Sequence, residues 1–216
     1  LCHYKGNKFF KKYHNQRING LLIKCIIEKE PLGTLKSLTN AKKSLENFFL
    51  LSNGDTFFDI NISNLYKKFD YKKNLMSLGA AEISTNDKQR YQNFLVKNKL
   101  LKKVFYSKKK TQIINSGLAI VNKKALNYAK KDFNSFDKHL IKSLTPKKKI
   151  QVEVFKKNFV DIGTPKDLNF FIKNANFFLK KPAIFLDRDG VVNYDYGYVH
   201  KKINFIWKKK VIEAIK

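Results

Sequence analysis

The alternation of apolar and polar residues divides most of this chain into short elements of two kinds. Apolar runs bounded by glycine, asparagine or aspartate predict strands, and apolar residues three to four positions apart predict helices. Strands are predicted at residues 20–28, 48–52, 75–83, 91–96, 101–106, 112–121, 150–155, 159–163 and 183–186. Helices are predicted at residues 35–45, 62–69, 123–130, 136–144 and 165–178, with Asn61 and Ser135 as N-caps. This alternation indicates an α/β fold with a mixed sheet.

Lys180-Lys181-Pro182 interrupts the pattern and marks the predicted domain boundary. We therefore expect a first domain at residues 1–180 and a second, shorter one at residues 181–216. The apolar fraction of 43% is enough for a core. The chain begins with Leu1 rather than Met and ends on Lys216 inside an amphipathic run. We expect both ends to be cuts in a longer protein.

Lysine dominates the charge of the chain. Lysine and arginine number 45 against 17 acidic residues, which gives a formal net charge of +28. Such a charge suits a nucleic-acid or anionic-membrane partner. However, the only arginines are Arg17, Arg90 and Arg188, whereas recognition of bases and phosphates favours the forked guanidinium. We interpret the lysines as a solvated surface and keep a basic nucleic-acid-binding module as the alternative.

The cysteines and the hydropathy pattern indicate a cytoplasmic protein. Cys2 and Cys25 have no zinc-binding spacing, and a reduced state is the default for such a pair. No apolar run reaches the roughly 20 residues of a membrane-spanning helix, and the start carries no secretory signal pattern. We expect no membrane partner.

Asp187 and Asp189 follow the apolar run 183–186. Gly190 allows the chain to turn after them, and active sites of open parallel sheets lie at the carboxyl ends of strands. Two carboxylates one residue apart can bind a divalent cation, and one can attack phosphorus while the other transfers a proton. The alternative is an Asp-Gly turn that closes a hairpin.

The longer run FLDRDGVVNYDYGYVH resembles the opening motif of haloacid-dehalogenase-type phosphatases, and more narrowly the heptose bisphosphate and histidinol phosphate phosphatases. The resemblance implies that Asp187 is the nucleophile that forms an aspartyl phosphate, that Asp189 is the general acid/base, and that both bind Mg²⁺. It also implies a HAD-like α/β domain, of which residues 181–216 contain the first strand and helix. His200 is a candidate substrate contact, with a solvated loop histidine as the alternative.

A second pair of carboxylates follows other apolar runs. Asp55 comes directly after the run 48–52 and the residues Asn-Gly, and Asp161 precedes the segment IGTP. Two aspartates at two strand ends can together hold one Mg²⁺ on the phosphates of a nucleotide. The alternatives are a hairpin turn at Asp55 and an ordinary strand-to-helix turn at Asp161.

Four segments in sequence, EPLGT, LSNGDTFFDI, INSGLAIV and FVDIGTPKDL, resemble the sugar-phosphate nucleotidyltransferases, most closely those that load mannose-type or heptose phosphates onto a nucleotide. The resemblance covers about residues 15–180 and implies a Rossmann-like mixed-sheet domain. It implies that Asp55 and Asp161 bind Mg²⁺ and that the substrates are an NTP, by the guanylyltransferase resemblance GTP, and a sugar phosphate. It places five residues at the nucleotide or sugar: Gly33, Gly54, Lys108, Asn115 and Gly117.

Three features depart from the pattern of this family. Residues 1–216 contain no glycine-rich phosphate loop, so we expect the fragment itself to be inactive. The segment 105–108 reads Phe-Tyr-Ser-Lys where the family has Phe-x-Glu-Lys, and Leu35-Lys36 replaces small residues. These two changes indicate an altered sugar preference or a degenerate, regulatory domain.

The two resemblances together predict a bifunctional enzyme of sugar-nucleotide synthesis for surface polysaccharides such as lipopolysaccharide. One domain would dephosphorylate a heptose bisphosphate, and the other would transfer a nucleotidyl group to the resulting heptose 1-phosphate.

Overall fold

The computed structural model describes residues 1–85, 90–180 and 184–215. Contacts within the chain divide it into two compact units, Leu1–Asn174 and Ala175–Lys216. The predicted boundary lies a few residues later, and its residues Lys181 and Pro182 lie outside the described part of the chain.

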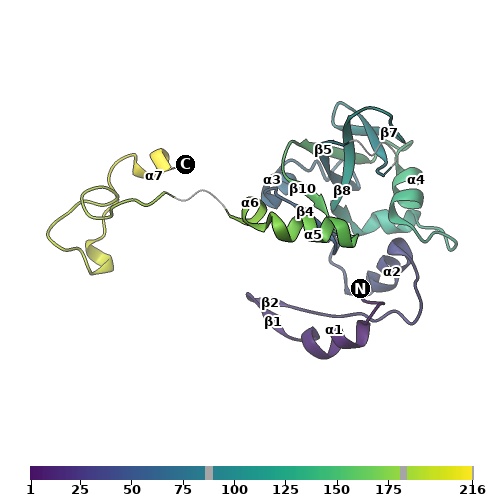
Figure 1. The fold of residues 1–216 in the computed structure, drawn as a ribbon, viewed down its shortest axis with the longest axis horizontal. Coiled ribbons are helices and arrows are strands. Elements are labelled where there is room, and N and C mark those ends of the chain that lie inside the picture. The colour runs from purple at the N-terminus through teal and green to yellow at the C-terminus, as the bar shows by residue number, and fades with distance from the viewer. Residues whose placement is uncertain (86–89, 181–183, 216) are drawn as a thin grey trace. The chain divides into compact units, whose positions relative to one another are not determined.

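A mixed sheet forms the body of the first unit (Figure 1). Its six strands are β3 Phe48–Ser52, β5 Met76–Ser84, β6 Asn93–Lys97, β7 Leu100–Phe105, β8 Thr111–Asn122 and β9 Ile150–Phe155. They lie in the order β3–β8–β5–β9–β7–β6, and β6 also pairs with β8. All neighbouring strands are antiparallel except β5 and β9, which are parallel. The predicted mixed sheet is thus confirmed.

Two small antiparallel sheets complete the strands of this unit. One pairs β1 (Arg17–Ile18) with β2 (Leu21–Leu22), and the other pairs β4 (Thr56–Phe58) with β10 (Phe159–Asp161). The second of these positions the candidate site, because β4 begins just after Asp55 and β10 ends on Asp161.

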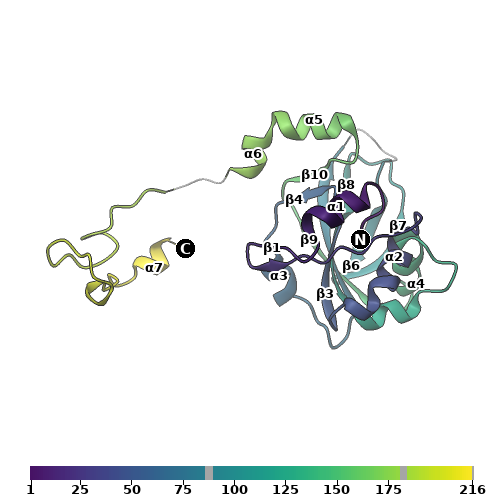
Figure 2. The same ribbon diagram turned by 90° about the horizontal axis from the view of Figure 1, so that it is seen from below.

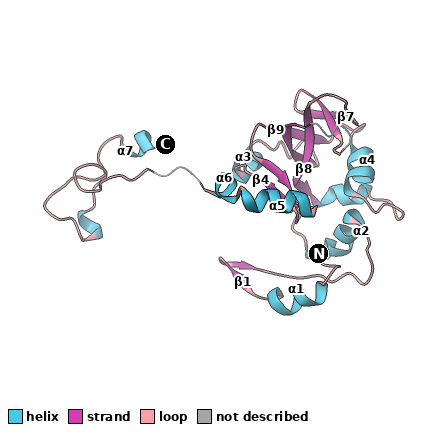
Figure 3. Cartoon of the chain, in the orientation of Figure 1, coloured by secondary structure: helices cyan, strands magenta, loops and turns pink. Residues whose placement is uncertain are grey.

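Helices flank the main sheet, as the cyan and magenta elements of Figure 3 show. In the first unit they are α1 Gly6–Tyr13, α2 Thr34–Asn40, the 3₁₀ helices η1 Ala41–Ser44 and η2 Lys123–Tyr128, α3 Ile62–Lys67, the π-helix η3 Phe136–Ile141, α4 Lys142–Leu144 and α5 Pro165–Lys173. Both predicted N-caps are confirmed. Asn61 Oδ1 accepts from Ser63 N at 2.9 Å, and Ser135 Oγ accepts from Lys138 N at 3.1 Å. Figure 2 shows α1 on the same side of this unit as the β1–β2 hairpin.

The alternation of side chains along β8 builds a core on both faces of the sheet. On one face Leu118 and Ile120 pack with Leu65 of α3 and with Phe69. On the opposite face Ala119 and Val121 join the larger cluster formed by β5, β9, α2, η3 and α4. Its fully buried members include Leu35, Met76, Leu78, Leu140, Leu144 and Ile150. Burial of each large apolar side chain contributes roughly 1.5–3 kcal/mol, so this cluster holds α2 and η3–α4 onto the sheet.

Several predicted elements differ in extent from the structure, and two of them differ most. Within the described residues, segment 20–28 forms a strand only at β2. Beyond β2, Ile23 bonds to the backbone of Asn15 and Gln16, and Ile27 forms an isolated bridge with Cys2 rather than joining a sheet. The predicted helix 165–178 is divided at Asn174, whose side chain donates to Phe170 O at 2.8 Å and ends α5 there.

The second unit consists of α6 (Ala175–Leu179), the 3₁₀ helix η4 (Lys202–Asn204), α7 (Val211–Ile215) and connecting turns. The prediction of a buried strand at residues 183–186 is wrong for residues 184–186. Ala183 lies outside the described residues. Ile184, Phe185 and Leu186 form no strand and are 82%, 96% and 47% exposed. A buried parallel strand needs neighbours on both sides, and residues 184–215 provide none.

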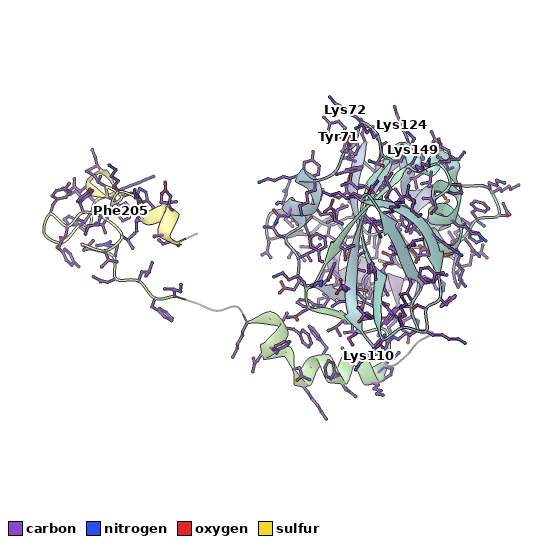
Figure 4. The ribbon with its side chains drawn as sticks, turned by 90° about the horizontal axis from the view of Figure 1, so that it is seen from above. Tyr71, Lys72, Lys110, Lys124, Lys149 and Phe205 are labelled. Atoms are coloured by element: carbon purple, nitrogen blue, oxygen red, sulfur yellow. The ribbon has the colours of Figure 1, made fainter. Side chains whose placement is uncertain are left out.

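The lysines are spread over the first unit. Lys72, Lys124 and Lys149 lie at one end of the sheet and Lys110 at the other (Figure 4). Within the described residues, no helix is both long and apolar enough to cross a membrane.

Candidate functional site

The aspartates that end two apolar segments meet at one point of the first unit. Asp161 at the end of β10 is paired with Thr56 of β4, and Ile162 N donates to Asp55 O at 2.8 Å. The segment before Asp55 does not form a hairpin, because β3 pairs with β8 whereas β4 pairs with β10. The structure therefore brings Asp55 and Asp161 together, as expected of two carboxylates that bind one cation.

Gly163 keeps a small space open between the two carboxylates. A Cβ added to Gly163 would lie 3.1 Å from Asp161 Oδ1 and 3.3 Å from Asp55 Oδ2. Within the described residues no group of three or more His, Cys, Asp or Glu side chains could hold a metal. Mg²⁺ is commonly bound by one or two carboxylates together with substrate phosphates. The pair and the space beside Gly163 fit such an ion.

An irregularity in the main sheet shapes the wall next to these carboxylates. The register between β5 and β8 shifts at Gly79, so that Ser116 and Gly117 bulge from the ladder. Gly117 has a φ of +73°, and its carbonyl accepts from Asn53 N at 2.8 Å. A Cβ on Gly117 would lie 2.6 Å from Asn53 Cγ. Only glycine fits this turn without strain.

Two hollows that share part of their lining border the site, one of about 830 Å³ and the other of about 300 Å³. Gly33, Thr34 and Gly54 line the larger, whereas Tyr91 and Asp161 line the smaller. Five residues line both: Asn53, Asp55, Asn115, Gly117 and Asp137. Asp55 therefore belongs to the wall that the two compartments share, and Asp161 lies beside it on the smaller one. This arrangement suits the joining of two ligands.

Asp137 is a cleft residue that the sequence analysis missed. Asn115 Nδ2 donates to Asp137 Oδ1 at 2.7 Å. Desolvation by the surrounding protein raises the pKa of Asp137, and the hydrogen bond from Asn115 opposes this shift. The position of Asp137 in the first turn after the cap Ser135 follows from the sequence. The approach of Asp137 to Asn115 depends on how η3 packs against β8.

Arg90 and Tyr91 were also missed, and both contact Asp161. Arg90 Nη2 lies 3.3 Å from Asp161 Oδ2, and Tyr91 Oη donates to the same oxygen at 3.4 Å. Burial raises the pKa of Tyr91 to about 12. Arg90 also forms two hydrogen bonds with Asp167, which raise the pKa of Arg90 and lower that of Asp167. An arginine in so lysine-rich a chain was a usable signal, because only arginine offers this forked geometry.

The remaining predicted site residues lie elsewhere. Lys108 is exposed between β7 and β8 and does not line either compartment. In the second unit, Arg188 binds Asp189 through two hydrogen bonds of 2.9 and 2.8 Å and lowers the pKa of Asp189. Asp187 is exposed, and the exposed His200 ring bonds only to Tyr198 O within the described residues.

Comparison with known proteins identifies relatives of this chain, although no family model matches the sequence. The chain is 35% identical over 167 residues to a D-glycero-α-D-manno-heptose 1-phosphate guanylyltransferase of Campylobacter jejuni, which covers 76% of this chain and 72% of that protein. It is 25% identical over 167 residues to the enzyme of the same name from Aneurinibacillus thermoaerophilus, covering 74% of this chain and 70% of that protein.

A solved structure is similar over a comparable share of this chain. The crystal structure of HddC from Yersinia pseudotuberculosis superposes with a TM-score of 0.61 at 26% identity, over 80% of this chain and 73% of that chain. A second structure of HddC contains GMP-PN. The chain thus has a mixed α/β, nucleotidyltransferase-like fold.

Proposed function

This chain belongs to the family of D-glycero-α-D-manno-heptose 1-phosphate guanylyltransferases, and we propose that it transfers a guanylyl group from GTP to a heptose 1-phosphate. The observation that carries the proposal is the convergence of Asp55 and Asp161 beside Gly163, where two compartments of the cleft meet. The names of the two relatives and the GMP-PN bound to HddC support the choice of substrates.

In this reaction a phosphate oxygen of the sugar 1-phosphate attacks the α-phosphorus of GTP. The bond from the α-phosphorus to the bridging oxygen of the β-phosphate breaks, and pyrophosphate leaves. No protein nucleophile is required, so the residues of the site bind and orient the two phosphates. We assign Asp55 and Asp161 to holding Mg²⁺, which supplies charge neutralisation at the phosphates when it is bound.

We assign each of the two substrates to one compartment of the cleft. We place the nucleoside in the larger one, next to Gly33, and the sugar phosphate in the smaller one, next to Tyr91 and Asn115. The bulge at Gly117 then turns Asn115 toward the junction, where its amide is held by Asp137.

The proposal is tested in the full-length protein by release of pyrophosphate from GTP in the presence of Mg²⁺ and heptose 1-phosphate, because residues 1–216 alone are expected to be inactive. Asp55→Asn and Asp161→Asn should each lower the rate at least about a hundredfold, because each removes one ligand charge. Asp132→Asn, at an exposed aspartate outside both compartments, should not. If folded protein releases no pyrophosphate with any sugar 1-phosphate, the alternative of a degenerate, regulatory domain is favoured.

We propose phosphatase activity at Asp187 as a second function of the protein. The observation in its favour is the turn after Asp187, in which Gly190 has a φ of +78° and Asp189 is held by Arg188 and by Asn193 Nδ2 at 3.0 Å. By the resemblance to haloacid-dehalogenase-type phosphatases, the Asp187 carboxylate would attack the phosphorus of a sugar phosphate. The bond to the sugar oxygen would break, and the sugar would leave as the alcohol with a proton from Asp189. Water would then hydrolyse the aspartyl phosphate to free phosphate and regenerate Asp187.

This second function has its own test. Asp187→Asn in the full-length protein should stop phosphate release from a heptose bisphosphate and leave guanylyl transfer to supplied heptose 1-phosphate unchanged. Phosphate release that persists in this variant would refute the assignment of Asp187.

A further inference from the structure

Asp137 is held on the wall of the cleft by its neighbours in η3. Ser135 caps η3 by accepting from Lys138 N at 3.1 Å, and the buried ring of Phe136 packs in the main core. Phe136 N also donates to Thr34 Oγ1 at 3.0 Å, which ties the start of η3 to the start of α2. η3 is a π-helix, and such turns are frequent at functional sites. The backbone of Asp137 is thus fixed by contacts within the protein.

The carboxylate of Asp137 has one oxygen bound and the other open. Asn115 Nδ2 donates to Asp137 Oδ1 at 2.7 Å, and Asn115 Oδ1 accepts from Gly117 N at 3.1 Å, which fixes the orientation of the amide. Within the described residues, Asp137 Oδ2 has no hydrogen-bond or ion-pair partner. The side chain is exposed to the cleft, although the surrounding protein desolvates it and raises its pKa. A ligand can therefore reach an oxygen that water solvates poorly.

The chemistry of the smaller compartment indicates what binds to this oxygen. Among the described residues, three carboxylates line that compartment, those of Asp55, Asp137 and Asp161. Asp55 and Asp161 are assigned to the cation, which leaves Asp137. Of the segment 105–108, which has serine in place of the glutamate of the resembled family, only Tyr106 lines the compartment. An ionised carboxylate only accepts hydrogen bonds and repels phosphate, so Asp137 suits a hydroxyl donor.

We propose that Asp137 determines which sugars the smaller compartment accepts: its Oδ2 accepts a hydrogen bond from a ring hydroxyl of the sugar 1-phosphate, while Asn115 holds its Oδ1. The inference rests on the proposed guanylyltransferase function and names the group that recognises the sugar. Asp137 also lines the larger compartment, where the ribose of GTP presents hydroxyls of the same chemistry. The experiment therefore separates the two sources.

The test compares heptose 1-phosphate with analogues that each lack one ring hydroxyl, by pyrophosphate release from GTP and Mg²⁺ in the full-length protein. For the wild type, one analogue should have a kcat/KM about ten- to a hundredfold below that of heptose 1-phosphate, because a hydrogen bond to a charged group is lost. Asp137→Asn keeps the shape of the side chain, but its amide oxygen turns to Asn115 and an N–H donor faces the sugar.

This variant should use heptose 1-phosphate about tenfold less efficiently and should no longer discriminate against that analogue by more than about threefold. A purely structural role would lower kcat/KM for both sugars by the same factor. The KM for GTP and the preference for GTP over 2′-deoxy-GTP should stay as in the wild type. Asp132→Asn, at an exposed aspartate outside both compartments, is the matched control and should keep the wild-type discrimination.

The outcomes separate this inference from the proposed function. A wild-type protein that releases no pyrophosphate with heptose 1-phosphate overturns the proposed function and this inference together. If the wild type is active but Asp137→Asn discriminates among the analogues as the wild type does, only the inference is overturned. If the variant instead loses the preference for GTP over 2′-deoxy-GTP, Asp137 binds the ribose and its assignment to the sugar 1-phosphate is wrong.

Discussion

Replacement of Gly163 by alanine tests the geometry of the proposed Mg²⁺ site most directly. The added Cβ would lie 3.1 Å from Asp161 Oδ1 and 3.3 Å from Asp55 Oδ2, closer than the roughly 3.5–4.0 Å of a comfortable contact. The oxygens must therefore retreat by a few tenths of an ångström. Mg²⁺ needs both oxygens at about 2.0–2.1 Å, and a methyl group then borders the space that the ion requires. Gly163 does not have a positive φ, so alanine adds no backbone strain.

The expected result is a selective loss of metal binding in a folded protein. We expect Gly163→Ala to weaken Mn²⁺ binding at least about tenfold, equivalent to about 1.4 kcal/mol, and to slow guanylyl transfer about a hundredfold because the phosphates are misplaced. The assays are a titration with Mn²⁺ followed by the loss of the free-ion EPR signal, pyrophosphate release and a thermal melt. The control is Gly54→Ala, where the new Cβ meets no atom within 4 Å and binding of Mn²⁺ alone should be kept. Wild-type Mn²⁺ affinity in Gly163→Ala would refute the site as described.

Three further predictions concern the cleft walls. Gly117→Ala combines a φ of +73° with a clash against Asn53 and should destabilise the protein by about 1–3 kcal/mol, visible as a lower Tm. The pKa of Asp137 is higher in the folded protein than in the unfolded chain, where it is about 3.9. The free energy of unfolding is therefore unaffected by this group below about pH 3.9, and it falls as the pH rises through the folded pKa. Asp137→Asn should therefore have a higher Tm than the wild type at neutral pH but not near pH 3. A Tm equal to that of the wild type at both pH values would contradict the raised pKa of Asp137. A spectrophotometric titration should show a tyrosine with a pKa of about 12 that is absent in Tyr91→Phe.

The sequence predicted the elements of the first unit well because most of them are locally encoded. The caps Asn61 and Ser135 and the strands predicted at residues 48–52 and 112–121 depend on nearby residues, and all were confirmed. The run 183–186 has equally strong apolar character, yet residues 184–186 form no strand. A strand depends on its neighbours as well as on its own residues, and a periodic pattern does not report whether those neighbours exist.

The candidate site was predictable only in part, for a related reason. Asp55 and Asp161 could be singled out because each follows an apolar run, and the resemblance to a family paired them. Arg90 is conspicuous as one of three arginines, but neither it nor Asp137 could be assigned to this site, because their positions come from contacts between distant segments. Arg90 reaches Asp167 across the junction of the β5–β6 connection with α5, and no local pattern encodes that meeting.

The pairing of β4 with β10 determines when during folding the two carboxylates come together. It joins the carboxylate after β3 to one near the end of the first unit, so the two halves of the metal site are far apart in the chain. Contacts of such long sequence separation tend to form late, since the intervening chain must first be ordered. An intermediate could thus hold the six-stranded sheet and still present one isolated carboxylate. A divalent ion that requires both would bind only the finished unit, and would stabilise it by mass action against opening at this ladder.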